Sequence, residues 1–146
     1  MDQPQPQVIE GPEAWHGRDM ASDPRWQFQL SSEDIADLEA ALECVRSRGL
    51  AWREMTSKDD FPLDRFAEKL ERVAEELEEG GGLVKMKGFP VDHFDEKDLN
   101  RIWYGVCLNL GTPIYQNYQG ELLRDIVNEQ KDTDAMNDNR LFAKDG

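Results

Sequence analysis

The stretch Leu83-Val84-Lys85-Met86-Lys87-Gly88-Phe89-Pro90, with the helical pattern that follows it, decides the fold expected for this chain of 146 residues. Residues 83–87 read as a short strand that is stopped by Gly88 and Pro90. From about residue 95 to residue 110, apolar side chains recur at helical spacing, which predicts an amphipathic helix. Its stripe consists of Leu99, Ile102, Trp103, Val106 and Leu110. A strand next to amphipathic helices predicts the α+β fold class.

Two further helices are predicted upstream of this strand. Ser31 with Asp34 makes a start that resembles a capping box, and Gly49 is a natural stop. The second helix is predicted to begin near Pro62, which suits a first-turn position, and to end at the glycines of residues 80–82. The apolar stripes of the two helices are Ile35, Leu38, Leu42 and Val45, then Phe66, Leu70, Val73 and Leu77.

The two ends of the chain carry weaker patterns. Residues 1–13 are predicted to be a disordered leader, and residues 14–127 to be the folded part, with Trp15 and Trp26 anchoring an irregular segment to it. Two short strands are expected at residues 114–118 and 122–127, with Gln119-Gly120 as the turn between them. Residues 128–146 are polar and aperiodic, so a loop or disordered tail is expected there.

The charge of the chain excludes several partners. The formal net charge is -14 at pH 7, and a surface of this sign repels phosphate backbones and anionic lipid. We therefore expect no binding to nucleic acid or membranes. No apolar stretch approaches the roughly 20 residues that span a bilayer, and no secretory pattern opens the sequence, so a cytoplasmic location is the default expectation. Cys44 and Cys107 lie among apolar residues and are predicted to be small buried hydrophobes.

The chemistry-bearing residues form no recognisable catalytic set. His93-Phe94-Asp95 matches the short H-x-D pattern that supplies two ligands of an iron triad, but no histidine follows His93 to complete it. Asp95 also stands where a helix N-cap is wanted, so a loop histidine beside a capping aspartate is the simpler interpretation. His16 has no nearby nucleophile or paired acid. The glycines of residues 80–82 precede a strand without a following GK[ST], which argues against a phosphate loop.

The order of the motifs is more informative than any one of them. The series is Gly11-Pro12-x-Ala14-Trp15-x-Gly17-x-Asp19, Trp26, Leu30-Ser31, Phe61-Pro62-Leu63, Gly82-Leu83-Val84-x-Met86-x-Gly88-Phe89-Pro90, Leu110-Gly111-x-Pro113-x-x-Gln116-Asn117 and Gly120-x-Leu122-Leu123-x-Asp125-Ile126. Over roughly residues 11–130 this series resembles the N-terminal part of TauD/TfdA-like oxygenases, the clavaminate-synthase-like group. The resemblance implies the flanking helices and first strands of a double-stranded β-helix, or jelly roll, which is expected to be incomplete in this chain.

The resemblance also implies an activity and its cofactors. Members of the family are oxidoreductases that use Fe(II), 2-oxoglutarate and O₂ to oxidise small organic substrates. Their H-x-D…H iron ligands and the arginine that grips 2-oxoglutarate come after the region matched here. Arg140 stands near the place where the family often has an arginine before the metal-binding strand, but its neighbours do not match. The expectation is therefore a truncated or partial member that holds no catalytic residue and no metal ligand, binds neither cofactor alone, and is inactive alone.

Gln116 and Asn117 are the candidate substrate-binding residues. They follow the Gly111 and Pro113 helix stop, and polar side chains at the end of an apolar helix can orient a substrate. Two solvent-facing strand residues are an equal alternative.

Two alternatives to a partial oxygenase stay open. One is a non-catalytic acidic interaction module, and the other is an unrelated α+β domain. If most of the sheet is missing, the apolar helix faces stay partly wet, so self-association through them is expected.

Overall fold

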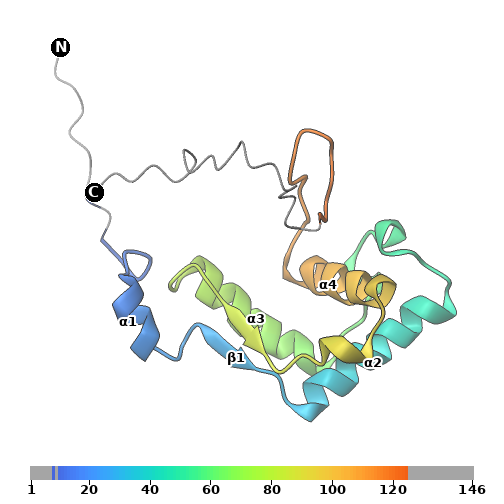
Figure 1. The fold of residues 1–146 in the computed structure, drawn as a ribbon, viewed down its shortest axis with the longest axis horizontal. Coiled ribbons are helices and arrows are strands. Elements are labelled where there is room, and N and C mark those ends of the chain that lie inside the picture. Colours follow the sequence, from blue (N-terminus) through green and yellow to red (C-terminus); the bar gives the residue numbers. More distant parts are fainter. Residues whose placement is uncertain (1–7, 9, 125–146) are drawn as a thin grey trace, which may run out of the picture. The chain divides into compact units, whose positions relative to one another are not determined.

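The computed structural model describes residue 8 and residues 10–124, and the chain divides into two compact units, Met1–Ile114 and Tyr115–Gly146. All regular elements of the described residues lie in the first unit (Figure 1). Its helices and strands are α1 (Gly17–Ser22), β1 (Gln27–Gln29), α2 (Ser32–Ser47), α3 (Arg65–Glu78), β2 (Lys85–Lys87) and α4 (Glu96–Leu110). Three short 3₁₀ helices, η1 (Trp52–Glu54), η2 (Lys58–Asp60) and η3 (Val91–His93), lie in the connections.

The predicted first helix is α2, and its ends are confirmed. The Ser31 hydroxyl accepts a hydrogen bond from the Asp34 N–H at 3.2 Å, and the Asp34 carboxylate accepts one from the Ser31 N–H at 2.7 Å. These two bonds are a reciprocal capping box. Just beyond the helix, Gly49 has a φ of 68°, a left-handed conformation that glycine adopts without a steric penalty.

The predicted second helix is α3, which begins at Arg65 and not near Pro62. The reason is a cap supplied by another helix. The Asp37 carboxylate of α2 accepts hydrogen bonds from the main-chain N–H groups of Asp64 at 3.0 Å and Phe66 at 2.9 Å. A carboxylate at this point satisfies N–H groups that have no partner within the helix, and so sets where the helix begins. The predicted apolar stripe holds for Phe66, Leu70 and Val73, while Leu77 is 40% exposed.

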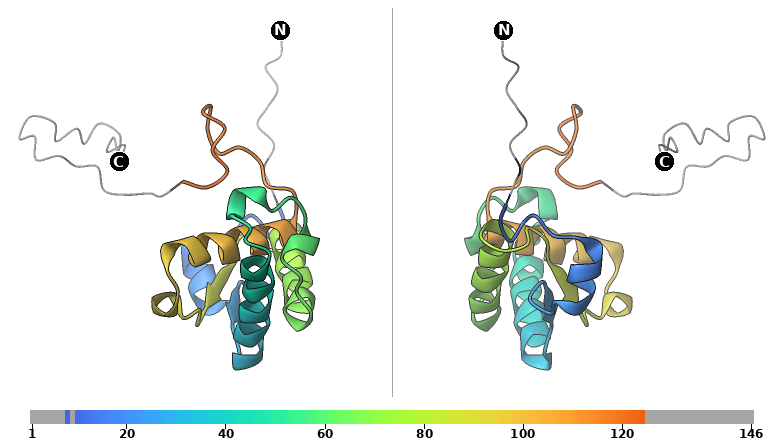
Figure 2. Two further views of the ribbon diagram at one scale, coloured as in Figure 1. Left: turned by 90° about the vertical axis from the view of Figure 1, so that its right-hand side faces the viewer. Right: turned by 90° about the vertical axis from the view of Figure 1, so that its left-hand side faces the viewer.

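The predicted third helix is α4, and it is confirmed with Asp95 as its N-cap. The Asp95 carboxylate accepts the Asp98 N–H at 2.9 Å, which satisfies one of the helix's first donors. The three long helices pack on one another, with α2 and α3 side by side and α4 running across the pair (Figure 2).

The sheet consists of β1 and β2, which pair in parallel with Phe28 opposite Met86. The predicted strand at residues 83–87 is confirmed at Lys85–Lys87 and is shorter than expected. Neither β1 nor α1 was predicted, because three residues of strand and six of helix leave no periodic pattern in the sequence. The described part of the chain thus combines helices with a two-stranded parallel sheet, and the wider jelly roll stays a prediction.

Both tryptophans of the N-terminal segment are held by their indole N–H groups. Trp15 donates to the carbonyl of Gly81 at 2.7 Å, and half-buried Trp26 donates to the carbonyl of Met20 at 2.8 Å. The first bond ties the segment that precedes α1 to the glycines after α3. The anchoring role predicted for Trp15 is confirmed, although Trp15 stays 41% exposed, whereas the indole bond of Trp26 stays within the N-terminal segment.

The second unit contains a turn but no strand among its described residues. The Gly120 N–H donates to the Asn117 carbonyl at 3.1 Å, and the Gln116 N–H donates to the Glu121 carbonyl at 2.7 Å. The turn predicted at Gln119-Gly120 is confirmed, whereas the strands predicted at 114–118 and 122–127 are wrong as far as residue 124. One main-chain bond across the turn does not extend into a ladder. Residues 125–127, the predicted tail at 128–146 and most of the predicted leader lie outside the described residues.

The core of the first unit is built around Phe61, which lies between η2 and α3. Its largest fully buried side chains are Phe61, Phe66, Leu38, Leu42, Met55, Val45 and Val73. The Phe61 ring lies against the backbone of Gly105 in α4, where an added Cβ would stand 2.2 Å from the ring. The Asn109 side-chain amide donates to the Phe61 carbonyl at 3.0 Å, which holds the preceding loop to the same helix. Only glycine at position 105 permits this close approach.

Two buried aspartates connect the helices through ion pairs. Asp98 of α4 accepts hydrogen bonds from Arg46 of α2 and, at 2.9 Å, from Arg101 one turn further along α4. The hydrogen bond from Arg46 lowers the pKa of Asp98 below its usual value, against the opposing effect of burial. Burial alone would raise the pKa of Asp34, but hydrogen bonds from Lys69 and Ser31 outweigh it and lower that pKa as well.

The two cysteines are free and half-buried. They were predicted to be buried, and the structure shows partial burial. Burial raises the pKa of the Cys107 thiol, which keeps it protonated at neutral pH.

Gly105→Ala tests the contact between Phe61 and α4. Alanine favours a helix interior by about 1 kcal/mol over glycine, but here its methyl group must displace a fully buried ring. We expect a net loss of about 1–3 kcal/mol in the free energy of unfolding, measured by urea denaturation. Gly111→Ala is the control, because nothing lies within 4 Å of a Cβ at that position. A Gly105→Ala chain as stable as the parent would show that the ring does not need the bare backbone.

Acid titration tests the ion pair between Asp98 and the two arginines. The pKa of Asp98 is lower in the folded state than its ordinary value of 3.8, so the unfolded state binds the proton more readily. The stabilisation is therefore complete above about pH 4 and is lost as the pH falls through the folded-state pKa. We expect Asp98→Asn to lower the urea midpoint at pH 7 and to flatten its fall below about pH 4. Asp92→Asn, at an exposed carboxylate, should leave both unchanged, and an equally steep fall in Asp98→Asn would contradict the assignment.

Candidate functional site

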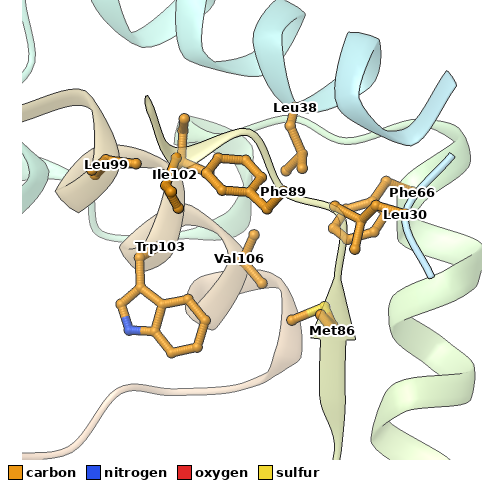
Figure 3. Close-up of a pocket in the computed structure, with 10 residues that line it drawn as sticks. Leu30, Leu38, Phe66, Met86, Phe89, Leu99, Ile102, Trp103 and Val106 are labelled. Atoms are coloured by element: carbon orange, nitrogen blue, oxygen red, sulfur yellow. The ribbon is translucent and has the colours of Figure 1, made fainter. Parts of the chain in front are cut away.

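An apolar groove of about 390 Å³ lies in the first unit. Figure 3 shows its walls, with Met86 of β2 on one side and Trp103 and Val106 of α4 on the other. The lining residues share one property, an apolar side chain, and they are Leu30, Leu38, Phe66, Met86, Phe89, Val91, Leu99, Ile102, Trp103 and Val106.

The groove lies between the three long helices and β2. Ile102 and Val106 stand one turn apart on α4 and are buried, while the adjacent Trp103 on the outer wall is 53% exposed. Leu38 of α2 and Phe66 of α3 close the floor and are almost fully buried. At the rim, Val91 is 53% exposed, and the rings of Phe89 and Phe94 stack with their centroids 5.5 Å apart. The floor of the groove therefore belongs to the hydrophobic core, whereas its rim consists of large apolar side chains that are exposed to solvent.

The chemistry of the lining indicates a packing surface. The indole N–H of Trp103 is the one polar side-chain group among the ten lining residues. Sites that hold a small molecule specifically combine apolar walls with a few polar groups that fix the ligand's orientation. Exposed apolar surface of this kind is more typical of contact with further polypeptide.

Neither histidine is part of a reactive arrangement. His93 ends the short helix η3 and is exposed, and the carboxylate of Asp95 is engaged by the Asp98 N–H at 2.9 Å. The capping role of Asp95 is confirmed, while His93 lies in the 3₁₀ helix η3 and not in a loop. His16 is exposed at the start of α1, where its main-chain N–H donates to the Asp19 carboxylate at 3.2 Å.

The described residues do not fit an iron centre. A non-haem iron of the oxygenase type needs three protein ligands on one face. Among residues 8 and 10–124, no group of three histidine, cysteine, aspartate or glutamate side chains stands close enough together to hold a metal ion.

Gln116 and Asn117 belong to the second unit, and Asn117 stabilises its turn. The Asn117 side-chain oxygen accepts hydrogen bonds from the N–H groups of Gln119 and Glu121, both at 3.1 Å. Its amide nitrogen donates to the Glu121 carboxylate. Gln116 is exposed. The structure thus gives Asn117 a local role in the turn, and a role of either residue in a substrate cavity stays a prediction.

The chain has a distant similarity to a known protein. No family model matches the chain. Over 113 residues it is 26% identical to FR-33289 synthase of Streptomyces rubellomurinus (strain ATCC 31215), an alignment that covers 77% of this chain and 33% of the synthase. The chain therefore spans about a third of the length of the relative it matches. In addition, none of the helices in the described part of the chain is long and apolar enough to cross a bilayer.

Trp103→Glu tests whether the groove is a contact surface. We expect the parent chain to self-associate as its concentration rises, because the half-exposed indole is best buried against another apolar surface. A carboxylate at position 103 should reduce this association in sedimentation velocity. The matched control is Leu77→Glu, which alters an exposed apolar side chain outside the groove and should behave like the parent. A parent chain that stays monomeric, or an equal effect of both variants, would contradict this view of the groove.

Proposed function

We propose that this chain is the front, helical portion of an Fe(II)- and 2-oxoglutarate-dependent oxygenase of the TauD/TfdA type. In this proposal the helices α2, α3 and α4 form a scaffold whose apolar groove packs on the enzyme's jelly roll. The observation that carries the proposal is the groove itself, which is apolar, partly wet and bounded by a sheet of only two strands in the described residues.

Two independent features support this proposal. The ordered motif series resembles the N-terminal part of that family. The alignment with a synthase extends over most of this chain and only a third of that protein, which agrees with a portion that works together with further sequence. The iron, the 2-oxoglutarate and the oxidation of a small organic substrate then belong to the rest of the enzyme.

The proposal also assigns a role to the second unit. Gln116 and Asn117 would face the substrate cavity in the complete enzyme, with the hydrogen bonds of Asn117 to residues 119 and 121 keeping the turn in one shape.

A chimeric enzyme tests the proposal. The residues of this chain that align with FR-33289 synthase replace the matching segment of the synthase, and the purified chimera is titrated anaerobically with Fe(II) and 2-oxoglutarate. We expect the chimera and the parent synthase to develop a metal-to-ligand charge-transfer absorption band. This chain alone should develop none, because its described residues bring no three ligands together.

Three results would count against the proposal. The first is a folded chimera that lacks the band while the parent synthase shows it. The second is a chimera that cannot fold, because the proposal requires these residues to supply that part of the enzyme. The third is a band in this chain alone that disappears in His93→Ala, which would place an iron ligand in the described part. A sharp, cooperative thermal transition of the dilute monomer would instead favour an independent interaction module.

A further inference from the structure

The outer edges of β1 and β2 differ in whether their main-chain N–H and C=O groups have hydrogen-bond partners. In a parallel ladder, alternate residues of a strand direct both their N–H and their C=O groups at the same neighbour. The Lys85 N–H donates to the Trp26 carbonyl at 2.8 Å, and the Lys87 carbonyl accepts the Leu30 N–H at 2.9 Å. Lys85 and Lys87 therefore face β1, and the main-chain groups of Met86 between them point to the opposite edge of β2.

The outer edge of β1 is already covered by the chain itself. The Gln27 N–H donates to the Pro24 carbonyl at 3.0 Å, and the Gln29 carbonyl accepts the Lys69 ammonium at 3.0 Å. Among the described residues, no loop or side chain is bonded in the same way to the outer edge of β2 at Met86. The sheet thus has one closed edge and one open edge.

The open edge lies beside the apolar groove and carries charges of one sign. The half-buried Met86 side chain lines the groove, opposite Trp103 and Val106 of α4 (Figure 3). Lys85 and Lys87 are exposed on the other face of the strand. An added strand places the side chain opposite Met86 on the groove face and the side chains opposite the two lysines on the charged face.

We propose that the open edge of β2 takes up an extended segment in which two acidic residues flank one apolar residue. The Met86 N–H and C=O bond to the main chain of this segment, its apolar side chain enters the groove, and its carboxylates pair with Lys85 and Lys87. The inference deepens the proposed function, on which it rests for the source of the segment: the segment is the next strand of the enzyme's sheet, from the part of the protein beyond the described residues.

The same features argue against a second copy of β2 as the occupant. Two copies paired antiparallel about Met86 would set Lys85 of one directly opposite Lys87 of the other, and like charges in that position destabilise a strand pair. Lysines on an edge strand are a common device against such self-pairing. The net charge of -14 slows but does not prevent the approach of a second copy, and the local lysines attract carboxylates.

The test uses the full chain, labelled with ¹⁵N, and a short synthetic peptide that alternates glutamate and valine, acetylated and amidated at its ends. We expect the peptide to shift the amide signal of Met86 and the signals of Ile102, Trp103 and Val106. In the double variant Lys85→Glu, Lys87→Glu the affinity should fall about tenfold for this peptide. The same variant should gain affinity for the matching lysine–valine peptide, which the parent chain does not bind.

Two variants at position 86 distinguish the contribution of the main-chain N–H to peptide binding from that of the side chain. Met86→Pro removes the outward N–H without touching the ladder to β1, and should abolish binding. Met86→Val keeps that N–H and a side chain toward the groove, and should bind. If Met86→Pro does not fold, the reversal of charge preference decides the question by itself.

Several outcomes would overturn the inference. These are shifts that avoid Met86 and the groove, or equal affinity of the parent for both peptides. The peptide experiment and the iron titration test different proposals. Peptide binding by this chain, with a chimera that lacks the charge-transfer band, would support the binding site at the edge of β2 and contradict the proposed oxygenase function. A chimera that shows the band, with no peptide binding to this chain, would support the oxygenase function and contradict the binding site at the edge of β2.

Discussion

The contact between the Phe61 ring and the backbone of Gly105 sets the arrangement of the first unit. Because a Cβ at position 105 would lie 2.2 Å from the ring, α4 can approach the core only with glycine there. The Asn109 amide holds the Phe61 carbonyl to the same helix at 3.0 Å, and Asp98 connects α4 to Arg46 of α2. The face of α4 that carries Gly105 therefore packs against the core, and this contact fixes the rotation of the helix about its axis.

That rotation determines what the other face of α4 can do. With Gly105 turned to Phe61, Ile102 and Val106 line the groove, and the neighbouring Trp103 stays 53% exposed on its outer wall. The first unit therefore has a closed side, where the core is complete, and an open side beside β2. Burying a side chain as large as tryptophan contributes roughly 1.5–3 kcal/mol or more, so an open side of this kind favours a further layer of polypeptide. The proposed oxygenase is one in which a sheet supplies that layer.

The sequence predicted those elements whose signals are local. Ser31 with Asp34 and Asp95 before Asp98 are caps made within one turn of helix, and both stand in the structure where the spacing indicated. The start of α3 was misplaced because its cap, Asp37, comes from another helix. The strands expected at 114–118 and 122–127 were wrong as far as residue 124. Alternation can indicate that a segment is able to form a strand, but pairing needs a neighbour that the sequence does not name.

The groove could be predicted only in part for the same reason. The helical stripes named Leu38, Phe66 and Ile102 as apolar, and these residues do form its floor and wall. Its other wall depends on the parallel pairing of β1 with β2, which joins residues 27–29 to residues 85–87, and the short β1 leaves no pattern of its own. No motif indicated that Met86 would stand between two lysines at an open edge. That feature follows from the register of the ladder.

Amide hydrogen exchange at β2 tests most directly whether the outer edge of β2 is free to pair with a further strand. In the dilute chain, the Lys85 N–H, which donates to the Trp26 carbonyl, should exchange slowly, while the Met86 N–H exchanges at close to the rate of an unprotected amide. In the chimera with FR-33289 synthase, both should exchange slowly, because an added strand would bond to Met86. Slow exchange of Met86 in the dilute monomer would contradict the account, since it would mean that the edge is already closed and that the first unit is complete by itself.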